Sequence, residues 1–440
     1  MRSRAHVSNR FFVVGLGALL LAACGGSAQL DVGSDRADGG ASGASRVGNP
    51  SAGSVNRGGT SSNGGASGAS TGGAPNGGAP SGGVPSAGTG NEAGSPEGGG
   101  AGEENVAGVG GEGGSIDSPC NPIRFADPNL ELVLRNSIGN HTTDITPAQA
   151  NGVLYVNAAA ANVSYLGGIE CFPNISTMYL SENPITDLSE ISALKKLELL
   201  DLSLDSIADF GPLRALPALK FLQLDQFKRA LTDADFTAIA QVPKLQSLTL
   251  TSDTFGSFAP LAASHTLGAL YFDSGHAGDP SSIALLTTLY SLAASSTNLQ
   301  VADLAALTQL EDLDFESNHV TDISALAPLV KMQGINLDNN AITDLSPLAG
   351  MVLLSEIDMN ANHITDLTPL EGLPYLSVLD LQENKIKTVA PLVQNFGLIS
   401  TGMVYLWENP LDCQAEQSNL EALAANHVTV QTDCPFVPFP

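Results

Sequence analysis

The sequence is poor in basic residues. It contains 18 lysines and arginines against 45 aspartates and glutamates, so its formal net charge is −27 over 440 residues. From Cys120 onward the imbalance persists, with 12 bases and 36 acids. Such a surface repels nucleic acid and anionic lipid, because both carry negative charge themselves. We therefore expect no nucleic-acid partner, and we favour cationic partners or divalent metal ions.

The sequence also lacks the short motifs of common enzymes. We find no glycine-rich phosphate loop, no nucleophile elbow and no paired His-Glu zinc motif. Scattered Ser, His and Asp residues do not make a catalytic triad, because a triad is defined by its geometry. We expect a protein that is not an enzyme and that has no cofactor. An unrecognised carboxylate pair, as in a hydrolase, is the alternative that the sequence leaves open.

Long apolar runs are missing as well. Residues 11–21 are apolar and follow three arginines, but this run is too short to span a bilayer comfortably, and no later segment looks transmembrane. We predict a targeting segment over residues 1–24. Its end, Leu-Ala-Ala-Cys24, resembles the lipobox of bacterial lipoproteins, in which the cysteine becomes the lipidated first residue. With Gly25 next, this resemblance implies a lipid anchor in the outer membrane. The alternative is an ordinary secretory signal with a chance cysteine.

Residues 25–118 have almost no large apolar side chain and consist mainly of Gly, Ala, Ser, Asn and Pro. Such a segment cannot offset the entropy lost on ordering, so we predict a disordered linker. A glycine-rich coil of about 90 residues has a root-mean-square reach of roughly 50–60 Å. We interpret it as a spacer that lifts the folded part off the membrane.

The folded part contains a repeat with a period of 22 residues. Segments that start at Leu310, Met332, Leu354 and Leu376 share the pattern L-x-x-L-x-L-x-x-N-x-I-x-D-L-x-P-L. The alternating L-x-L predicts a short strand with one buried face, and the Asn marks a turn where its amide can bond the backbone of adjacent coils. The D-L-x-P-L segment predicts an extended or 3₁₀ return. No copy can bury its apolar face alone, so the copies must stack.

A period of this length is typical of leucine-rich repeats. We predict an α/β fold, a leucine-rich-repeat right-handed solenoid that forms a curved rod with a concave parallel sheet. The repeats occupy residues 175–411, with six further coils that start at Ile175, Leu197, Leu219, Leu245, Leu267 and Leu289. The coil 219–244 has 26 residues, and its extra residues predict a short convex helix near 231–236. Three middle coils replace the asparagine by Asp253, Gly275 and Thr297.

Both ends of the solenoid need a cap. We predict an N-terminal cap and a degenerate first coil over residues 119–174. Asp127 and Pro128 predict the start of a cap helix that runs to about Ile138 and is ended by Gly139. We predict a C-terminal cap over residues 412–440, with a helix around Leu420.

The caps carry a more specific resemblance. The segments RFADPNLELVLRNSIG, DITPAQ and LGGIECFPNISTMYLSENPITDLSEISALKKLELLDLS resemble the cap and first repeats of internalin-type bacterial leucine-rich-repeat proteins. The segment ENPLDCQAEQSNLEALAANHVTVQTDC resembles the C-terminal flanking caps of extracellular leucine-rich-repeat proteins. The resemblance implies a surface protein that binds another macromolecule. No immunoglobulin-like domain and no cell-wall sorting signal follow the repeats, so it does not imply host-cell invasion.

Five cysteines fit this interpretation. Cys24 is assigned to the lipid, and we expect Cys120 to pair with Cys171 and Cys413 to pair with Cys434. Disulfides suit an exported chain. The alternative for both pairs is free, buried thiols.

The outward strand positions of the repeats gather acids on the concave face. Strands lie about 4.8 Å apart, so these side chains become close neighbours. We predict a ligand-binding strip made of Asp312, Asp314, Glu316, Asp338, Glu356, Asp358 and Asp380, with Tyr405 and Trp407 at its end. The strip suits a basic protein or peptide, it could hold Ca²⁺, or it could serve solubility alone. We expect a monomeric protein-binding module, with a Ca²⁺-binding protein or a purely structural spacer as alternatives.

Other polar residues recur at the convex side of the repeat. Their spacing predicts caps of the convex turn for Asp187, Asp209, Asp322, Asp344 and Asp366. His319 and His363 share one repeat position two coils apart, too far for one metal ion without a third group, and we interpret both as exposed turn residues.

Overall fold

The computed structural model describes residues 120–251, 254–274, 276–399 and 401–435. The predicted targeting segment 1–24, the lipidation site Cys24 and the linker 25–118 lie outside the described residues, as do Asp253 and Gly275. None of the helices in the described part is both long and apolar enough to cross a membrane.

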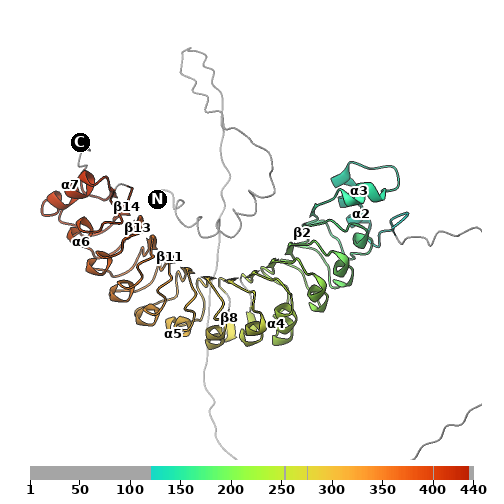
Figure 1. Cartoon of the computed structure of the whole chain (residues 1–440), viewed down its shortest axis with the longest axis horizontal. Coiled ribbons are helices and arrows are strands. Elements are labelled where there is room, and N and C mark those ends of the chain that lie inside the picture. Colours follow the sequence, from blue (N-terminus) through green and yellow to red (C-terminus); the bar gives the residue numbers. More distant parts are fainter. Residues whose placement is uncertain (1–119, 252–253, 275, 400, 436–440) are drawn as a thin grey trace, which may run out of the picture. The chain divides into compact units, whose positions relative to one another are not determined.

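The described residues form a solenoid around one long parallel sheet, which follows the concave side of the arc in Figure 1. Neighbouring strands pair in register, so that Leu313, Ile335 and Ile357 stack on one another inside the coils. The predicted leucine-rich-repeat fold is therefore confirmed. In order, the strands are β1 (Tyr155–Asn157), β2 (Thr177–Tyr179), β3 (Leu199–Asp201), β4 (Phe221–Gln223), β5 (Ser247–Thr249), β7 (Ala269–Tyr271), β9 (Ser291–Ala293), β10 (Asp312–Asp314), β11 (Gly334–Asn336), β12 (Glu356–Asp358), β13 (Val378–Asp380), β14 (Met403–Tyr405) and β15 (Thr429–Gln431).

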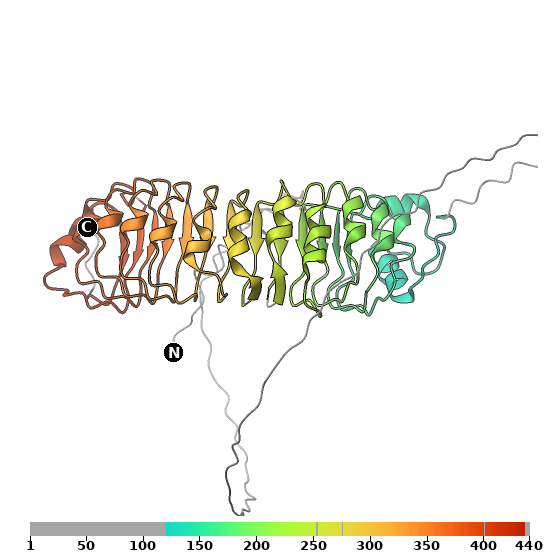
Figure 2. The same cartoon turned by 90° about the horizontal axis from the view of Figure 1, so that it is seen from below.

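Short helical turns return the chain along the convex side, where Figure 2 shows them side by side. Most are 3₁₀ turns, as the repeat pattern predicts: η1 (Ile169–Cys171), η2 (Ser189–Ala193), η3 (Gly211–Ala215), η4 (Ala259–Ala263), η5 (Pro280–Leu285), η6 (Ser324–Leu326), η7 (Ser346–Leu348) and η8 (Thr368–Leu370). Two are single α-helical turns, α5 (Val301–Leu304) and α6 (Ala390–Val393).

The recurring convex aspartates support these turns from a position slightly different from the predicted one. Each carboxylate accepts a hydrogen bond from the backbone N–H two residues later, as Asp366 does from Thr368 at 2.9 Å. The same bond is made by Asp187, Asp209, Asp322 and Asp344. The aspartates therefore precede the helix cap by one residue and form Asx turns that lead into the helix.

The coil that starts at Leu219 carries the predicted convex helix, α4 (Asp233–Ala240), which begins after the capping residue Thr232. The next two coils add a two-stranded parallel sheet on the convex side, β6 (Thr254–Ser257) and β8 (His276–Asp279). Beyond β8, the side-chain amide of Asn298 accepts from the N–H of Ala277 at 3.2 Å and donates to its carbonyl at 2.9 Å. Four phenylalanine rings with centroids 5.0–6.5 Å apart pack in this region: Phe236, Phe255, Phe258 and Phe272.

A ladder of asparagines joins successive coils. The side-chain oxygen of Asn340 accepts from the N–H of Val320 in the preceding coil at 2.8 Å. Its amide nitrogen donates to the carbonyl of Leu337 in its own coil at 3.0 Å and to that of Phe315 in the preceding coil at 3.2 Å. An amide can donate and accept at one site, so it satisfies backbone groups of two coils at once. The same arrangement is found at Asn183, Asn362, Asn384 and Asn409.

Both predicted caps are present. In the N-terminal cap, α2 (Pro128–Ile138) starts at Asp127, whose carboxylate accepts from the N–H of Asn129 at 2.8 Å and from that of Ser164 in the first coil at 2.6 Å. Asp127 thus fixes the cap helix and also ties it to the solenoid. Gly139 ends α2 with φ +66°, in the left-handed region that favours glycine. A second cap helix, α3 (Pro147–Asn151), was not predicted.

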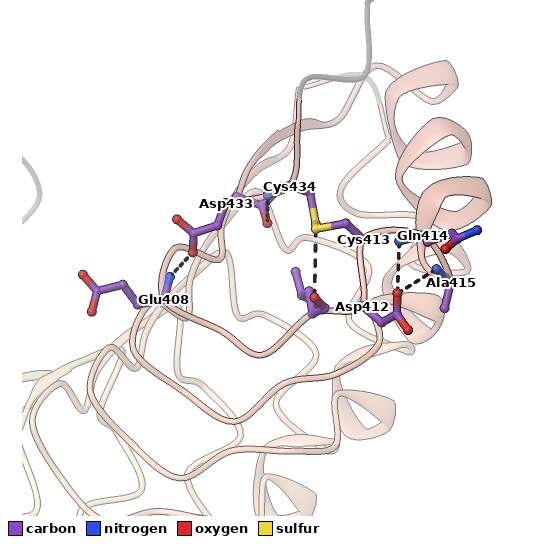
Figure 3. The surroundings of a disulfide bond; sticks show 9 residues. Glu408, Asp412, Cys413, Gln414, Ala415, Asp433 and Cys434 are labelled. Atoms are coloured by element: carbon purple, nitrogen blue, oxygen red, sulfur yellow. Dashed lines mark hydrogen bonds between the residues drawn. A yellow bond between two sulfur atoms is a disulfide. The ribbon is translucent and has the colours of Figure 1, made fainter.

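The C-terminal cap contains the predicted helix, α7 (Gln417–Ala425), followed by the last strand β15. The predicted disulfides Cys120–Cys171 and Cys413–Cys434 are both formed. Figure 3 shows the second one, next to Asp412, whose carboxylate accepts from the N–H groups of Gln414 and Ala415. The bonds close loops with sequence separations of 51 and 21 residues, which corresponds to roughly 3–4 kcal/mol each in the chain-entropy treatment.

In the coil that starts at Leu197, Asp205 takes the place of the ladder asparagine. Asp205 is fully buried, and its Oδ1 accepts from the N–H of Asn183 at 2.7 Å. Its Oδ2 has no hydrogen-bond partner in the described part of the chain. In the coils that keep the asparagine, the second atom of this side chain is an amide nitrogen that donates to backbone carbonyls, and an ionised carboxylate cannot donate. Burial raises the pKa of Asp205 to about 7.

We predict that Asp205→Asn stabilises the fold most at alkaline pH. The folded chain keeps the proton of Asp205 up to about pH 7, whereas the unfolded chain loses it near its ordinary pKa of 3.8. Below a pH of 3.8, the stability that protonated Asp205 contributes to the fold is therefore fully present. This stability is lost as the pH rises to about 7. The expected gain of the variant is ~1–3 kcal/mol at about pH 8 and little at about pH 4, measured by urea unfolding.

The exposed Asp144 provides the control, because Asp144→Asn makes the same chemical change outside the ladder. A gain from Asp205→Asn that did not vary with pH, or that Asp144→Asn matched, would contradict the assignment.

Candidate functional site

The concave face brings the predicted acids together. We call Asp312, Asp314, Glu316, Asp338, Glu356, Asp358 and Asp380 the acidic strip. The strand register aligns Asp314, Asn336, Asp358 and Asp380 in one row, which continues to Tyr405. A second row aligns Asp312, Gly334, Glu356, Val378 and Met403. Alternation along the strands sends both rows outward while the residues between them enter the core.

Parts of the acidic strip are less accessible than the repeat pattern suggested. Asp358 is 3% exposed and Asp380 is 1% exposed, whereas Asp312, Asp314 and the remaining acids of the strip are half-buried. Neighbouring coils carry polar side chains at the same register position, and the short distance between strands makes these side chains cover one another. The row of Asp358 and Asp380 therefore forms the floor of the concave face.

Neighbouring polar groups satisfy most of these carboxylates. Asp338 accepts from the backbone N–H of Asn360 at 2.6 Å and from its side-chain amide at 3.1 Å. Asp380 accepts from the side-chain amide of Gln382 at 2.9 and 3.0 Å. Asp314 accepts from the hydroxyl of Ser295 at 2.8 Å. Asp358 differs, because its Oδ1 is buried and has no partner in the described part of the chain.

The five aspartates of the strip hold protons more tightly than isolated carboxylates do, because their pKa values are raised. Burial is the largest cause, and it raises the pKa of Asp358 to about 8 together with the negative charges of Asp338, Glu356, Asp380 and Asp314. Burial also raises the pKa of Asp338 to about 6. The pKa values of Asp312, Asp314 and Asp380 are raised for the same reason. The convex Asp322 and Asp366 behave in the opposite way, because hydrogen bonds from the next turn lower their pKa.

Basic side chains in the described residues do not neutralise the strip. The three ion pairs found there are Arg135–Glu131, Lys220–Glu198 and Arg229–Asp235, all outside the strip. A cluster of three or more His, Cys, Asp or Glu residues placed to hold a metal ion is likewise not found in the described residues. His319 and His363 are exposed, as predicted.

Aromatic residues lie near both ends of the concave face. Beyond Asp380, the next coil contributes the half-buried Tyr405 and Trp407, which is 39% exposed. At the other end Tyr155 and Tyr179 stand on neighbouring strands with ring centroids 5.8 Å apart. Tyr155 was missed by the sequence analysis. Its signal was its place on the first, degenerate coil, one position before the buried Val156.

Comparison with known proteins agrees with this fold. A family model described as leucine-rich repeats (2 copies) matches residues 308–350 and 330–372. The chain is similar to the structure of an internalin (InlF) from Listeria monocytogenes, with 26% identity over 72% of this chain and 94% of that chain and a TM-score of 0.58. Comparison with curated proteins gives no match.

Two further solved structures align over similar lengths. Internalin C2 from Listeria monocytogenes is 26% identical over 67% of this chain and 99% of that chain, with a TM-score of 0.30. A leucine-rich-repeat protein from Leptospira interrogans is 16% identical over 65% of this chain and 97% of that chain, with a TM-score of 0.43.

We predict that infrared spectroscopy of the folded protein detects protonated carboxyl groups near neutral pH. Their carbonyl band is expected to decrease in steps, with one midpoint near pH 7 from Asp205 and a later one near pH 8 from Asp358. Asp358→Asn should remove only the later step, and Asp205→Asn only the earlier one. A spectrum without any protonated carboxyl above about pH 6 would show that the pKa of Asp358 is not raised as described.

Proposed function

We propose that the chain is a cell-envelope lipoprotein whose concave face binds a basic protein or peptide without performing chemistry. The observation that carries this proposal is the acidic strip, a dense group of carboxylates that has no basic partner among the described residues. The similarity to an internalin and the leucine-rich repeats over residues 308–372 support a binding module.

Charge and shape support a basic partner. Like charges held on neighbouring strands repel one another, so a cationic surface that enters the concave face relieves this repulsion as it binds. Tyr405 and Trp407 add apolar contact area next to the strip, and aromatic side chains are enriched where binding energy concentrates. The partner we expect is therefore a basic segment with an apolar neighbour that reaches the coil of Trp407.

Two disulfides support an exported location for the described domain. We propose that Cys24 carries the lipid, that residues 25–118 act as a spacer, and that the anchor lies in the outer membrane of a bacterial envelope. The lipid is then the membrane attachment, and the protein works as a monomer.

We predict that neutralising the concave acids weakens binding more than neutralising convex acids does. The concave variant combines Asp312→Asn, Asp314→Asn and Glu356→Gln. The convex control combines Asp322→Asn, Asp344→Asn and Asp366→Asn, which replaces the same number of acids within residues 310–375 and keeps an oxygen for each Asx turn. For an oligolysine peptide, we expect the concave variant to bind about tenfold more weakly, and added salt to weaken binding to the natural chain.

The fluorescence of Trp407, the only tryptophan of the chain, provides the readout at the end of the strip. If both triple variants weaken peptide binding equally, the effect comes from net charge alone, and the concave face is not the binding surface. A natural chain that binds no basic peptide at low salt would overturn the proposal itself.

We predict that Cys24→Ala releases the protein from the membrane. In bacterial cells that express the full chain, the natural protein should incorporate labelled fatty acid and sediment with outer membranes, because acyl chains bury in the bilayer. The variant should stay unlabelled and soluble in the envelope fraction. Cys120→Ser is the matched control, since it removes a cysteine without touching the proposed anchor. Labelling that persists in Cys24→Ala would refute the lipoprotein assignment.

A further inference from the structure

Four carboxylates surround the middle of strand β11. Asp312 and Asp314 stand on β10, and Glu356 and Asp358 stand at the same two register positions on β12. Between them β11 presents Gly334 and Asn336. We call these four carboxylates, Asp312, Asp314, Glu356 and Asp358, the carboxylate frame.

The members of the frame influence one another across β11. Burial is the largest cause of both raised pKa values. The charges of Glu311 and then of Glu356 also raise the pKa of Asp312, and the charge of Asp314 is among the four that raise the pKa of Asp358. The register places no side chain between Asp312 and Glu356, because the residue there is Gly334. At this row, therefore, no polar side chain of β11 lies between Asp312 and Glu356 to reduce the repulsion between their charges.

A second observation singles out the same place. Asp358 is 3% exposed, and its buried Oδ1 has no hydrogen-bond partner in the described part of the chain. The other buried or half-buried carboxylates of the strip, such as Asp314, Asp338 and Asp380, each accept hydrogen bonds from neighbouring groups. A buried acceptor without a donor is rare in folded proteins. Unlike the oxygen of Asp205, which lies within the asparagine ladder, that of Asp358 belongs to an outward strand position of the concave face, where a partner can supply the donor.

We propose that the carboxylate frame receives one cationic side chain of the partner, a lysine ammonium or an arginine guanidinium, above Gly334. The proposal rests on the function proposed above and assigns its central contact. The cation lies between two acidic strands, where it supplies donors to carboxylates that face one another and to the Oδ1 of Asp358.

The chemistry of the frame suits an organic cation better than a metal ion. Calcium takes about six to eight oxygen ligands at close range, and the described residues contain no cluster of three acids or histidines placed to hold a metal ion. An ammonium or guanidinium needs fewer contacts, and its N–H groups form charge-assisted hydrogen bonds with carboxylates that stand further apart. At Gly334 no side chain of β11 stands between the two acidic strands.

Binding of the cation is coupled to release of a proton. Near neutral pH the natural chain holds a proton on Asp358, whose pKa is raised to about 8. The charged groups that act on Asp358 are all acidic and come from its own strand and from both sides: Glu356, Asp314, Asp338 and Asp380. A cation favours the ionised form, so binding should tighten between about pH 6 and about pH 9.

The first test places the cation inside the protein and needs no partner. Gly334→Lys puts an ammonium on a flexible stem into the frame, and Gly334→Met adds a stem of similar shape without the charge. Both should fold, because the same strand position holds Leu199, Phe221 and Val378 in other coils. We expect the Tm of the lysine variant to exceed that of the methionine variant by roughly 2 °C or more at about pH 8, with the difference falling towards about pH 5.

The lysine variant should also shift the infrared titration of Asp358 to lower pH, and the methionine variant should not. Equal Tm values at every pH, together with an unchanged titration of Asp358, would overturn the proposal. This outcome would leave the function of the concave face as a whole intact, since it concerns the frame alone.

The second test uses an oligolysine peptide and calorimetry in phosphate and Tris buffers, whose heats of ionisation differ. Near pH 7 the natural chain should release up to about one proton for each peptide bound, and Asp358→Asn should abolish this release. Gly334→Lys should bind the peptide at least about tenfold more weakly than the natural chain.

Tight peptide binding with the same heat in both buffers and no effect of Gly334→Lys would refute the frame as the contact while the concave face remains the binding surface. A natural chain that binds no basic peptide would refute the proposed function, and the comparison of Gly334→Lys with Gly334→Met would still decide whether the frame holds a cation.

Discussion

The stacking of each coil on the next, in register, is the constraint on which the rest of the structure depends. One coil has an apolar face that it cannot bury alone, so stability comes from neighbours. The in-register sheet holds equivalent residues about 4.8 Å apart, whatever their chemistry. For Leu313, Ile335 and Ile357 this proximity builds the core. For Asp314, Asp358 and Asp380 the same proximity gathers negative charge, and the fold must tolerate it.

The asparagine ladder shows how closely the register is tied to side-chain chemistry. Asn340 serves two coils because one group both donates and accepts. Where the chain replaces this residue, it adds other support. The coils whose ladder positions are Asp253 and Gly275 are joined by the convex strands β6 and β8 and by a cluster of phenylalanines, and the coil of Thr297 is tied to β8 by the amide of Asn298. Asp205 has no such substitute, and its buried second oxygen remains the weak point of the ladder.

The sequence predicted those features that follow from periodicity or from local signals. The 22-residue period located the strands and the 3₁₀ returns, Asp127 and Gly139 marked the ends of the cap helix, and the cysteine pairs followed from the resemblance of the caps. Periodicity says which face a side chain takes, but not how far its neighbours cover it. The burial of Asp358 and Asp380, the short helix α3 and the convex strands therefore appeared only in three dimensions. The unpartnered oxygen of Asp358 likewise depends on atoms of several coils, and no single repeat contains the signal.

The edge of the small convex sheet has a bearing on where other molecules can attach. Exposed strand edges recruit foreign strands, because their unpaired N–H and C=O groups are ready templates. At Ala277 both groups are already occupied by the amide of Asn298, a side chain that mimics the next strand and cannot extend the sheet. Backbone-to-backbone capture of an extended peptide is blocked at this residue. On the opposite, concave surface, the side chains select the binding partner. These side chains can differ from coil to coil while the backbone of the solenoid stays the same.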